Sequence, residues 1–352
     1  MKGKVRVLVI ATSRKTRGGI TAVVKAYEQA DLWKRYHCKW IETHIDKCGF
    51  YKILYFIRGL FKFIFTAFSF DLIHIHMSEP SSAIRKVIFM WFSNLMHKKT
   101  IVHFHSYSSE TTIYSKYKWI YRYLFVKTDC VLVLSEYWKK EINDAFELGD
   151  KVRIIYNPCV EPHFEKYYKK QKQILYAGTV NVRKGYCVLI KSFAKIAAKY
   201  SDWQIVFAGN GEVEQGKALA KELRIDDQVI FLGWVNGAAK DKTFQEASIF
   251  CLPSYAEGFP MSVLDALAYG LPMVTTPVGG LPDVLVHEKN SMVFEPGNIN
   301  TLAEHLETLI LNESLSKKLS KASLELSNEQ FNIKTITQQL SVLYDDLIDS
   351  SR

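Results

Sequence analysis

The sequence predicts an α/β fold made of two Rossmann-like, doubly wound domains that face one another across a cleft. The chain has 352 residues, and because a domain holds about 150 residues, two domains are expected. Short β-branched runs alternate with helical patterns, which is typical of parallel sheets with helices on both faces. The alternation stops once near the middle of the chain and then restarts. Two such domains in tandem would bind a ligand where the carboxyl ends of their sheets face each other.

The first half of the chain contains six strand candidates separated by helical patterns. The strands are expected at residues 5–10, 39–44, 72–76, 100–105, 131–134 and 153–156. Helices are expected at residues 20–32, 82–97, 116–126 and 136–147. These elements predict an N-terminal domain over residues 1–160.

The segment 161–172 (EPHFEKYYKKQK) is charged and has no clear period, so it is predicted to be a linker. Beyond it, residues 173–334 are predicted to form the C-terminal domain, and residues 335–352 a last helix that could return to the N-terminal domain. The second set of strands is expected at residues 174–176, 204–208, 229–232, 249–252, 273–275 and 291–294. Helices are expected at residues 186–199, 215–224, 239–247, 261–268, 299–311, 314–327 and 335–347.

Charge is distributed unevenly between the two halves. The chain carries 46 Lys+Arg and 36 Asp+Glu, a net charge of +10, with 48% hydrophobic and 23% charged residues. Such a composition argues against a disordered or fibrous protein. Residues 1–160 hold 26 Lys/Arg and 13 Asp/Glu, a net of +13, whereas the rest of the chain has a net of −3. The two halves are therefore expected to meet different partners, and the basic half is expected to face the acceptor.

The six cysteines predict neither a disulfide framework nor a structural zinc site. They are scattered along the chain, and no C-x-x-C pair or His cluster with metal-ligand spacing accompanies them. The apolar run near the N-terminus is too short for a secretory leader and is interpreted as a strand. A reducing, cytoplasmic location is expected.

The segment 53–70 (ILYFIRGLFKFIFTAFSF) is apolar enough to suggest a membrane span, but it contains Arg58 and Lys62. Four residues apart on a helix, the two charges share one face and make spanning costly. Two interpretations remain open: a helix that covers a sheet, or a helix that lies on an anionic membrane surface. The second would make the protein peripheral at the inner face of the cell membrane.

A glycine turn at residues 178–185 (GTVNVRKG) lies between a strand and a helix. The helix N-terminus and the adjacent cations Arg183 and Lys184 suit a diphosphate. A second strand-to-glycine turn contains Gly209, Asn210 and Gly211. It is no dinucleotide fingerprint, because Glu214 stands where the third glycine would be.

The densest motif covers residues 253–266 (PSYAEGFPMSVLDA). Gly258 gives a turn, and Pro260 suits the first position of a helix. The backbone N–H groups of the first turn would then be free to bind an anion. These groups are those of Phe259, Met261, Ser262 and Val263. Glu257 and Asp265 are eight positions apart, about 12 Å along a helix. Two interpretations are open for this pair: carboxylates that bracket a diphosphate, or a helix cap and a solvated surface residue.

Together these motifs resemble the retaining GT-B glycosyltransferases of family 4, the nucleotide-sugar-dependent "group 1" transferases. The resemblance spans nearly the whole chain. It rests on the glycine–lysine run at 178–185, the Gly209–Gly211 turn, the FLGWV strand end at 231–235 and the carboxylate pair. The segments 269–272 (YGLP) and 278–283 (VGGLPD) also match.

The resemblance implies roles for several residues of the C-terminal domain. Lys184 would neutralise the donor diphosphate, Glu257 would contact hydroxyls of the donor sugar, and Asp265 stands where the family usually has a ribose-binding Glu. Thr179 stands where the family often has Arg, a charge that Arg183 could replace. Further donor-binding positions are implied at Asn210, Gly211, Val235, Gly258, Phe259, Pro260, Met261, Ser262 and Val263.

The N-terminal domain is expected to contribute two features. By the resemblance, the loop containing Gly18 and Gly19 reaches the donor phosphate and the acceptor. His105, at the end of a strand, matches the family histidine beside the transferred sugar, so that His105, Lys184 and Glu257 form the predicted catalytic set. His74 and His76 alternate on one strand and are interpreted as structural.

The predicted activity is transfer of a sugar from a nucleotide diphosphate to a glycan or lipid-linked glycan, in the assembly of a bacterial cell-surface polysaccharide such as a capsule or exopolysaccharide. UDP-sugar is favoured over GDP-mannose. The sequence contains no D-x-D, so no metal is expected, and the nucleotide-sugar is a co-substrate rather than a cofactor. The resemblance implies front-face retention, so Glu257 is not assigned as a nucleophile. No nucleic acid partner is expected.

We compared this activity with those of other classes of protein. A dinucleotide oxidoreductase would need a complete glycine fingerprint followed by an acidic residue, and none is present. A GT-B-like epimerase or a glycogen-type phosphorylase would share the architecture. A catalytically silent sugar-binding subunit would explain Thr179 and Asp265.

Overall fold

The computed structural model describes residues 5–162 and 169–349 of the chain. It contains two compact units, one formed by Met1–Pro158 together with Ile333–Arg352 and the other by Cys159–Asn332. Half of the predicted linker, residues 163–168, lies outside the described residues.

Unit 1 is built on a six-stranded parallel sheet with strand order β2-β1-β3-β4-β5-β6. The strands follow the expected runs closely, because consecutive β-branched and apolar residues are buried on both faces of such a sheet. Their bounds are β1 Val7–Ala11, β2 Lys39–Glu42, β3 Leu72–Met77, β4 Lys99–Phe104, β5 Cys130–Val133 and β6 Val152–Ile154.

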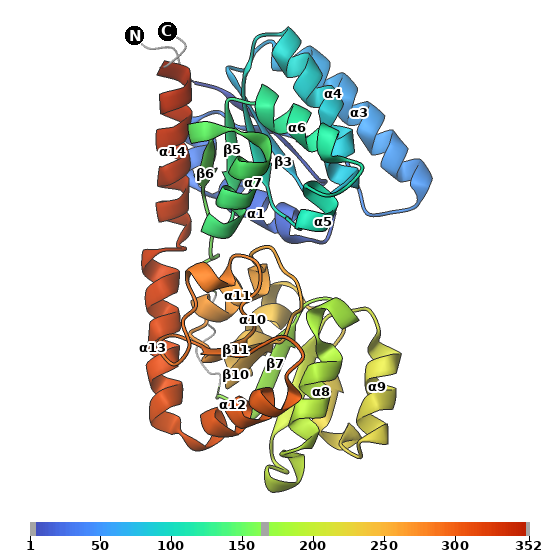
Figure 1. The fold of residues 1–352 in the computed structure, drawn as a ribbon, viewed down its shortest axis with the longest axis vertical. Helices are drawn as coiled ribbons and strands as arrows, with labels where there is room; N and C mark the ends of the chain where they lie inside the picture. The colour runs from blue at the N-terminus through green and yellow to red at the C-terminus, as the bar shows by residue number, and fades with distance from the viewer. Residues whose placement is uncertain (1–4, 163–168, 350–352) are drawn as a thin grey trace. The chain divides into compact units, whose positions relative to one another are not determined.

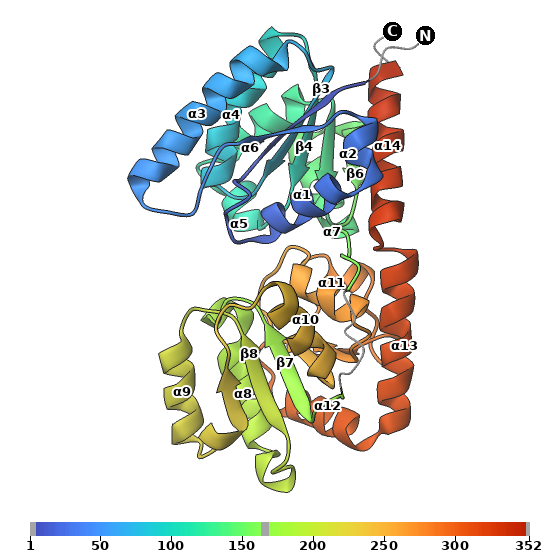
Figure 2. The ribbon, with the colours of Figure 1, turned by 180° about the vertical axis from the view of Figure 1, so that it is seen from behind.

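Helices cover both faces of this sheet (Figures 1 and 2). Helices α3, α4 and α6 lie on one side, whereas α1, α2 and α14 lie on the other. The C-terminal helix therefore returns to the N-terminal sheet, where Tyr36 donates a hydrogen bond to Asp345 Oδ1 at 2.9 Å. The bounds are α1 Gly19–Gln29, α2 Asp31–Arg35, α3 Gly49–Ala67, α4 Ser81–Leu95, α5 Ser109–Thr112, α6 Lys118–Lys127, α7 Glu136–Phe146 and α14 Ile333–Asp349.

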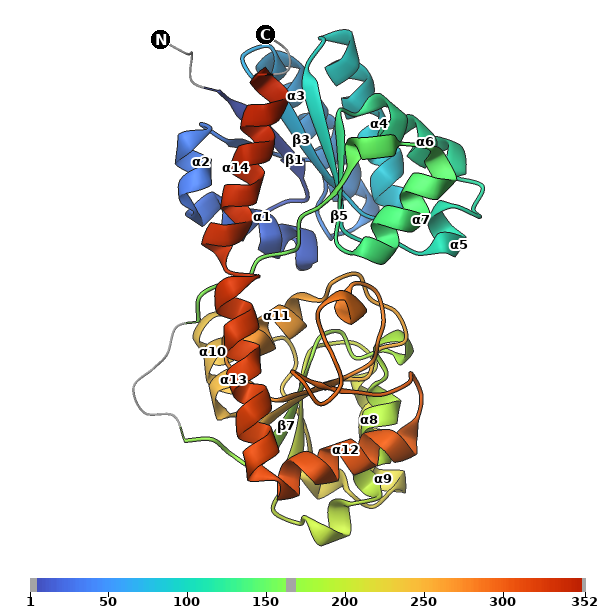
Figure 3. The same ribbon diagram turned by 60° about the vertical axis from the view of Figure 1, so that its left-hand side comes forward.

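Unit 2 has a second six-stranded parallel sheet, with strand order β12-β11-β10-β7-β8-β9. The bounds of its strands are β7 Gln173–Ala177, β8 Gln204–Ala208, β9 Val229–Phe231, β10 Ile249–Leu252, β11 Met273–Thr275 and β12 Met292–Val293. Figure 3 shows α8 and α12 on one side of it, and α10, α11 and α13 on the other. The helices are α8 Tyr186–Ala194, α9 Val213–Glu222, α10 Gly237–Glu246, α11 Met261–Ala268, α12 Ile299–Leu311 and α13 Glu313–Glu329.

Three helix predictions differ from the structure. The helix expected at residues 20–32 is divided into α1 and α2, because Ala30 adopts an extended conformation (φ −85°, ψ 160°) that interrupts the helix. The helix expected at 186–199 ends at Ala194 and continues as a short 3-10 turn. The short helix α5 was not predicted, since its four polar residues show no helical period.

Candidate functional site

The centre of the candidate site in unit 2 is an ion pair between Lys184 and Glu257. Lys184 Nζ lies 2.5 Å from Glu257 Oε1, and the two side chains are 12% and 7% exposed. The two residues are 73 positions apart in the chain. Arg183 NH1 approaches the other carboxylate oxygen, Oε2, at 3.8 Å. The structure thus brings together three of the residues that the sequence selected for the donor phosphate and sugar.

Glycines allow the chain to hold this pair. Gly185 has φ +72°, and a Cβ there would lie 2.0 Å from Pro253 O, so the turn after Lys184 packs directly on the loop that carries Glu257. A Cβ at Gly178 would lie 3.3 Å from Lys184 Cδ, because the lysine side chain runs along this glycine. Asn181 Oδ1 accepts a hydrogen bond from Lys184 N at 3.0 Å. The glycine–lysine run therefore forms one surface of the ion-pair site.

Ser254 is a residue of this site to which the sequence interpretation gave no role. It is fully buried, and its hydroxyl donates a hydrogen bond to Glu257 Oε1 at 2.9 Å. Backbone contacts also hold the glutamate loop, since Gly280 N donates to Gly258 O at 2.8 Å. The carboxylate is consequently positioned by a serine, a lysine and a glycine turn from three different parts of the chain.

Helix α11 begins just after this loop and differs in two details from the expectation. Pro260 is the N-cap residue rather than the first helical residue. The amide of Val263 donates a hydrogen bond to Pro260 O at 3.0 Å. The prediction that this amide is free to bind an anion is therefore wrong. The amides of Met261 and Ser262 have no hydrogen-bond acceptor among the described residues. The side chain of Phe259 is buried against Phe331 and anchors the loop.

Asp265 is neither a solvated surface residue nor an unpaired carboxylate. Its Oδ1 lies 2.6 Å from Lys240 Nζ of α10, and its side chain is 14% exposed. Burial raises the pKa of Asp265, and the nearby Lys240 ammonium acts in the opposite direction. The sequence analysis did not identify Lys240, because nothing in the local pattern of α10 distinguishes it from other surface lysines.

The other predicted donor-binding residues of unit 2 lie in loops that follow strands. Val180 N donates to Asn210 O at 2.8 Å, so the Asn210–Gly211 turn packs on the glycine–lysine run. Thr179 is exposed, and its carbonyl accepts a hydrogen bond from Tyr176. Val235 lies in the loop between β9 and α10.

In unit 1, four histidines form a column on the face of the sheet that α1 and α14 cover. His74 and His76 lie on β3, and His103 and His105 lie on β4 or just beyond its end, with His76 and His103 paired in register. Adjacent rings lie 4.1 to 5.1 Å apart between centroids. This histidine column is what two H-x-H patterns produce on neighbouring parallel strands, since alternate residues face the same side.

Hydrogen bonds join the histidine column to its surroundings and to itself. His76 Nδ1 lies 2.8 Å from His105 Nε2, and His74 Nδ1 lies 2.7 Å from Tyr344 of α14. Burial lowers the pKa of His74 and of His105 to about 3 in each case, although a hydrogen bond with Asn157 acts against this at His105. The rings are therefore neutral at neutral pH.

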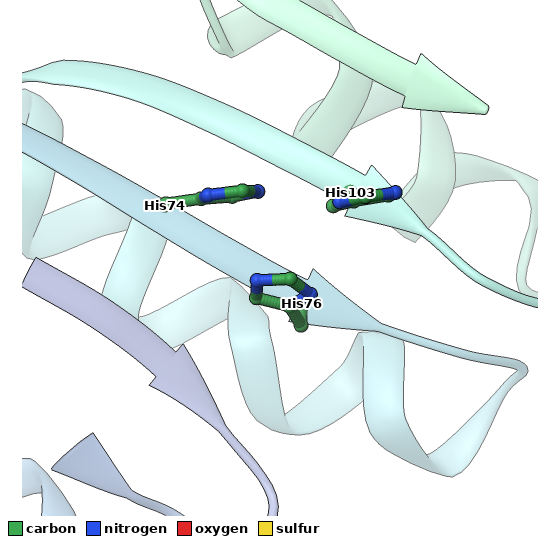
Figure 4. Close-up of side chains that lie close together, drawn as sticks. All are labelled: His74, His76 and His103. Carbon is green, nitrogen blue, oxygen red and sulfur yellow. The ribbon is translucent and has the colours of Figure 1, made fainter. Parts of the chain in front are cut away.

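Three of these rings could hold a metal ion, a feature that the sequence analysis did not anticipate. His74, His76 and His103 can each bring one nitrogen within 4.8 Å of the other two, and Figure 4 shows them on adjacent strands. Imidazole nitrogens suit zinc, copper or nickel. However, the rings of His74 and His103 are parallel within 3°, and Nδ1 of His74 and of His76 is already hydrogen-bonded.

The column predicts that acid weakens unit 1. As the pH falls from about 6.5 toward 3, the unfolded chain binds protons that the folded His74 does not. Stability is then lost by up to about 1.4 kcal/mol per pH unit for each such histidine. Urea unfolding at pH 7 and at pH 5 measures the change in the free energy of unfolding. Hydrogen exchange of the amides of β3 and β4 then shows whether the loss lies in this part of the sheet. His74→Phe should reduce the pH dependence; an unchanged dependence would contradict the explanation.

The glycine loop of unit 1 lies at the start of α1. Gly18 is the N-cap residue, with φ +155°, and both Gly18 and Gly19 are exposed. No side chain caps this helix N-terminus. The loop therefore offers backbone N–H groups without side chains in front of them.

Comparisons with known proteins agree with this architecture. Residues 4–159 match the family model described as Glycosyltransferase Family 4, and residues 161–325 match the model described as Glycosyl transferases group 1. An uncharacterized glycosyltransferase of Haemophilus influenzae is 32% identical over 221 residues, 62% of each chain. The lipopolysaccharide 1,6-galactosyltransferase of Salmonella typhimurium is 27% identical over 194 residues, 53% of each chain. The chain thus matches only about half to six-tenths of the length of these relatives.

A solved structure shares the fold over almost the whole chain. The crystal structure of the Anabaena protein HepE in complex with UDP-glucose superimposes with a TM-score of 0.79 and 17% sequence identity. The match covers 97% of this chain and 99% of that one. At this identity, the likeness concerns the fold.

Proposed function

Because the chain belongs to the GT-B glycosyltransferases of group 1 and family 4, we propose that it transfers a sugar from a UDP-sugar to a glycan or lipid-linked glycan with retention of configuration. The name of the Salmonella relative and the UDP-glucose bound to the Anabaena protein support this choice of acceptor and donor. The pathway proposed is the assembly of a cell-surface polysaccharide, such as a capsule or exopolysaccharide, in the cytoplasm.

The proposal is based on the largely buried ion pair between Lys184 and Glu257. The two opposite charges lie 2.5 Å apart and neutralise each other. A diphosphate would draw the Lys184 ammonium to itself, and Glu257, still held by Ser254, could then accept hydrogen bonds from sugar hydroxyls. The site thus exchanges an internal ion pair for two contacts to the donor.

The proposed mechanism needs negative charge to be stabilised on the departing diphosphate. Lys184 supplies a positive charge, and so, at the start of α11, do the amides of Met261 and Ser262, which have no acceptor in the described part of the chain. The departing phosphate oxygen would accept the proton of the acceptor hydroxyl on the same face of the sugar, so that no carboxylate nucleophile is required. The lack of D-x-D in the chain supports a reaction without a metal bridging the diphosphate.

Ligand-dependent thermal stability tests the donor class. We expect UDP and UDP-sugars to raise the melting temperature more than GDP, ADP or their sugars, because only a nucleotide that binds the folded state stabilises it. Product analysis with the stabilising donor then identifies the transferred sugar. Equal stabilisation by GDP-mannose would overturn the preference for UDP, whereas no stabilisation by any nucleotide-sugar would favour a catalytically silent subunit.

We also propose that unit 1 binds an anionic membrane surface through α3 and α4. Among the described residues, no helix is both long and apolar enough to cross a membrane. Helix α3 buries Gly59, Phe63 and Ala67, and a wide apolar face remains exposed. The exposed apolar side chains of α3, its end and α4 are Phe50, Tyr51, Ile53, Leu54, Ile57, Phe61, Phe65, Phe68, Ile84, Trp91 and Leu95.

The charge of this face complements anionic lipid. Lys47, Lys52, Arg58 and Lys62 are exposed along α3 or just before it. Neither α3 nor α4 contains Asp or Glu. Asp46, next to Lys47, is an exposed acidic residue just before α3, but the four cations outnumber it. An apolar surface bordered mainly by cations is typical of helices that lie in the interface of an anionic bilayer.

Replacement of Phe61 and Phe65 by Glu should weaken membrane binding. Each exposed phenylalanine that enters the bilayer contributes about 1.5–3 kcal/mol, so the double variant should bind vesicles containing phosphatidylglycerol at least tenfold more weakly. Vesicle sedimentation at low salt measures this. Trp119→Glu, at an exposed aromatic residue outside α3 and α4, is the control. Undiminished binding, or equal binding to neutral vesicles, would contradict the assignment of this surface.

A further inference from the structure

The histidine column places polar rings where a sheet normally buries apolar residues. His74, His76 and His103 are 0 to 1% exposed. The Nε2 atoms of His74 and His76 have no hydrogen-bond partner among the described residues. Burying unpaired polar atoms costs stability that valine or isoleucine at the same positions would not cost. This cost in stability indicates that the buried histidines have a role other than packing.

The column reaches the surface at one residue only. His105 follows the end of β4 and is partly exposed, whereas its three companions are buried. Its Nε2 is bonded to His76 Nδ1 at 2.8 Å, and its ring stacks on His103 at 4.1 Å between centroids. The ring of His105 therefore cannot rotate without breaking a buried hydrogen bond, so His76 and His103 fix its orientation.

The bond between His76 and His105 also determines which atom of His105 is available. One proton is shared between His76 Nδ1 and His105 Nε2, because both rings are neutral. Nε2 is thereby occupied inside the protein. The remaining ring nitrogen, Nδ1, is buried beside Asn157, so it is the nitrogen left for a ligand hydroxyl once that contact is displaced.

We propose that His76 is a positioning residue, which holds the ring and the protonation pattern of His105 for contact with the transferred sugar. The inference rests on the proposed function and on the role that the family resemblance implies for His105, beside the transferred sugar. His103 supports the ring of His105 by stacking, and Tyr344 of α14 ends the column at His74. The sequence analysis interpreted His74 and His76 as structural; this inference gives His76 a role in turnover.

Two conservative substitutions separate positioning from packing. Asparagine places its amide near the position of Nδ1, whereas glutamine places it near Nε2. We expect His76→Asn to retain most of kcat and His76→Gln to lose it about 10- to 100-fold, which is typical when a group is misplaced by about an ångström. The dissociation constant of UDP, which lacks the sugar, should not change in either variant.

His74→Phe is the matched control, since His74 lies on the same strand and face but makes no hydrogen bond to His105. Its kcat should stay close to the wild-type value. Equal losses in His76→Asn, His76→Gln and His74→Phe would show that the column only supports the fold, and would overturn the proposal. Stoichiometric zinc in the purified wild-type protein, lost in His74→Phe, would also overturn it, because the column would then be a metal centre.

His105→Ala distinguishes this inference from the proposed function. If His105→Ala loses turnover but His76→Gln does not, positioning by His76 is wrong and the role of His105 stands. If His105→Ala keeps full turnover with an unchanged UDP affinity, the role assigned to His105 is itself wrong.

Discussion

Lys184→Ala is expected to lower kcat/KM with the UDP-sugar by about a thousandfold or more while the protein stays folded. The Lys184 side chain is 12% exposed, and removing one preorganised donor that stabilises developing charge costs about 10²- to 10³-fold in rate. Loss of the contact to the ground-state diphosphate adds to this. Steady-state kinetics together with UDP titration measure both contributions. Full activity in this variant would refute the proposed site.

The ion pair itself requires a control for stability. Removing Lys184 or Glu257 alone leaves the other charge nearly buried, which costs about 3–5 kcal/mol at fully buried sites. Glu257→Ala should abolish turnover as well, with a lower melting temperature. The double variant Lys184→Met with Glu257→Gln should recover stability but not activity. Lys191→Ala, at an exposed position of α8, should behave as wild type.

Gly279→Ala is expected to reduce turnover about a hundredfold without touching a polar side chain. Gly279 has φ +63°, and a Cβ there would lie 2.2 Å from Glu257 O and 2.3 Å from Gly258 O. The loop that carries Glu257 must therefore move, and a displacement of about 1 Å can cost this much in rate. Steady-state kinetics and melting temperature measure the effect.

Gly237→Ala is the control for this substitution. Gly237 also has positive φ, +51°, but no atom would lie within 4 Å of a Cβ there. Gly237→Ala should therefore lower the free energy of unfolding by about 1 kcal/mol, which is the cost of a Cβ at positive φ. Its turnover should stay unchanged. Equal loss of turnover in both variants would show that strain, and not the position of Glu257, explains the result.

The sequence alone predicted the two-domain α/β fold and most of its strands. Runs such as Val7–Ala11 and Ile249–Leu252 are locally unambiguous, because parallel strands buried on both faces need uninterrupted apolar residues. The glycine–lysine run and the Glu257 motif could also be found from sequence, since turns, helix starts and cations act within a few residues of one another. The break at Ala30 was missed because the pattern on either side of it is equally helical.

Only the tertiary structure decided which side chains meet. Lys184 and Glu257 were selected separately, but their ion pair joins residues 73 positions apart. The pair of Lys240 and Asp265 was not foreseen. Likewise, the H-x-H patterns each predict two rings on one face of a strand, but only the pairing of β3 with β4 stacks them into one column.

The same distinction applies to α3. Its sequence determined an amphipathic, cationic helix, but left open whether the sheet or a membrane would cover the apolar residues. The structure shows that three of them are buried and that a wide face stays exposed. Local patterns determine which residues share a face, because backbone geometry repeats every few residues. What covers that face depends on contacts between distant segments, which chain order does not specify.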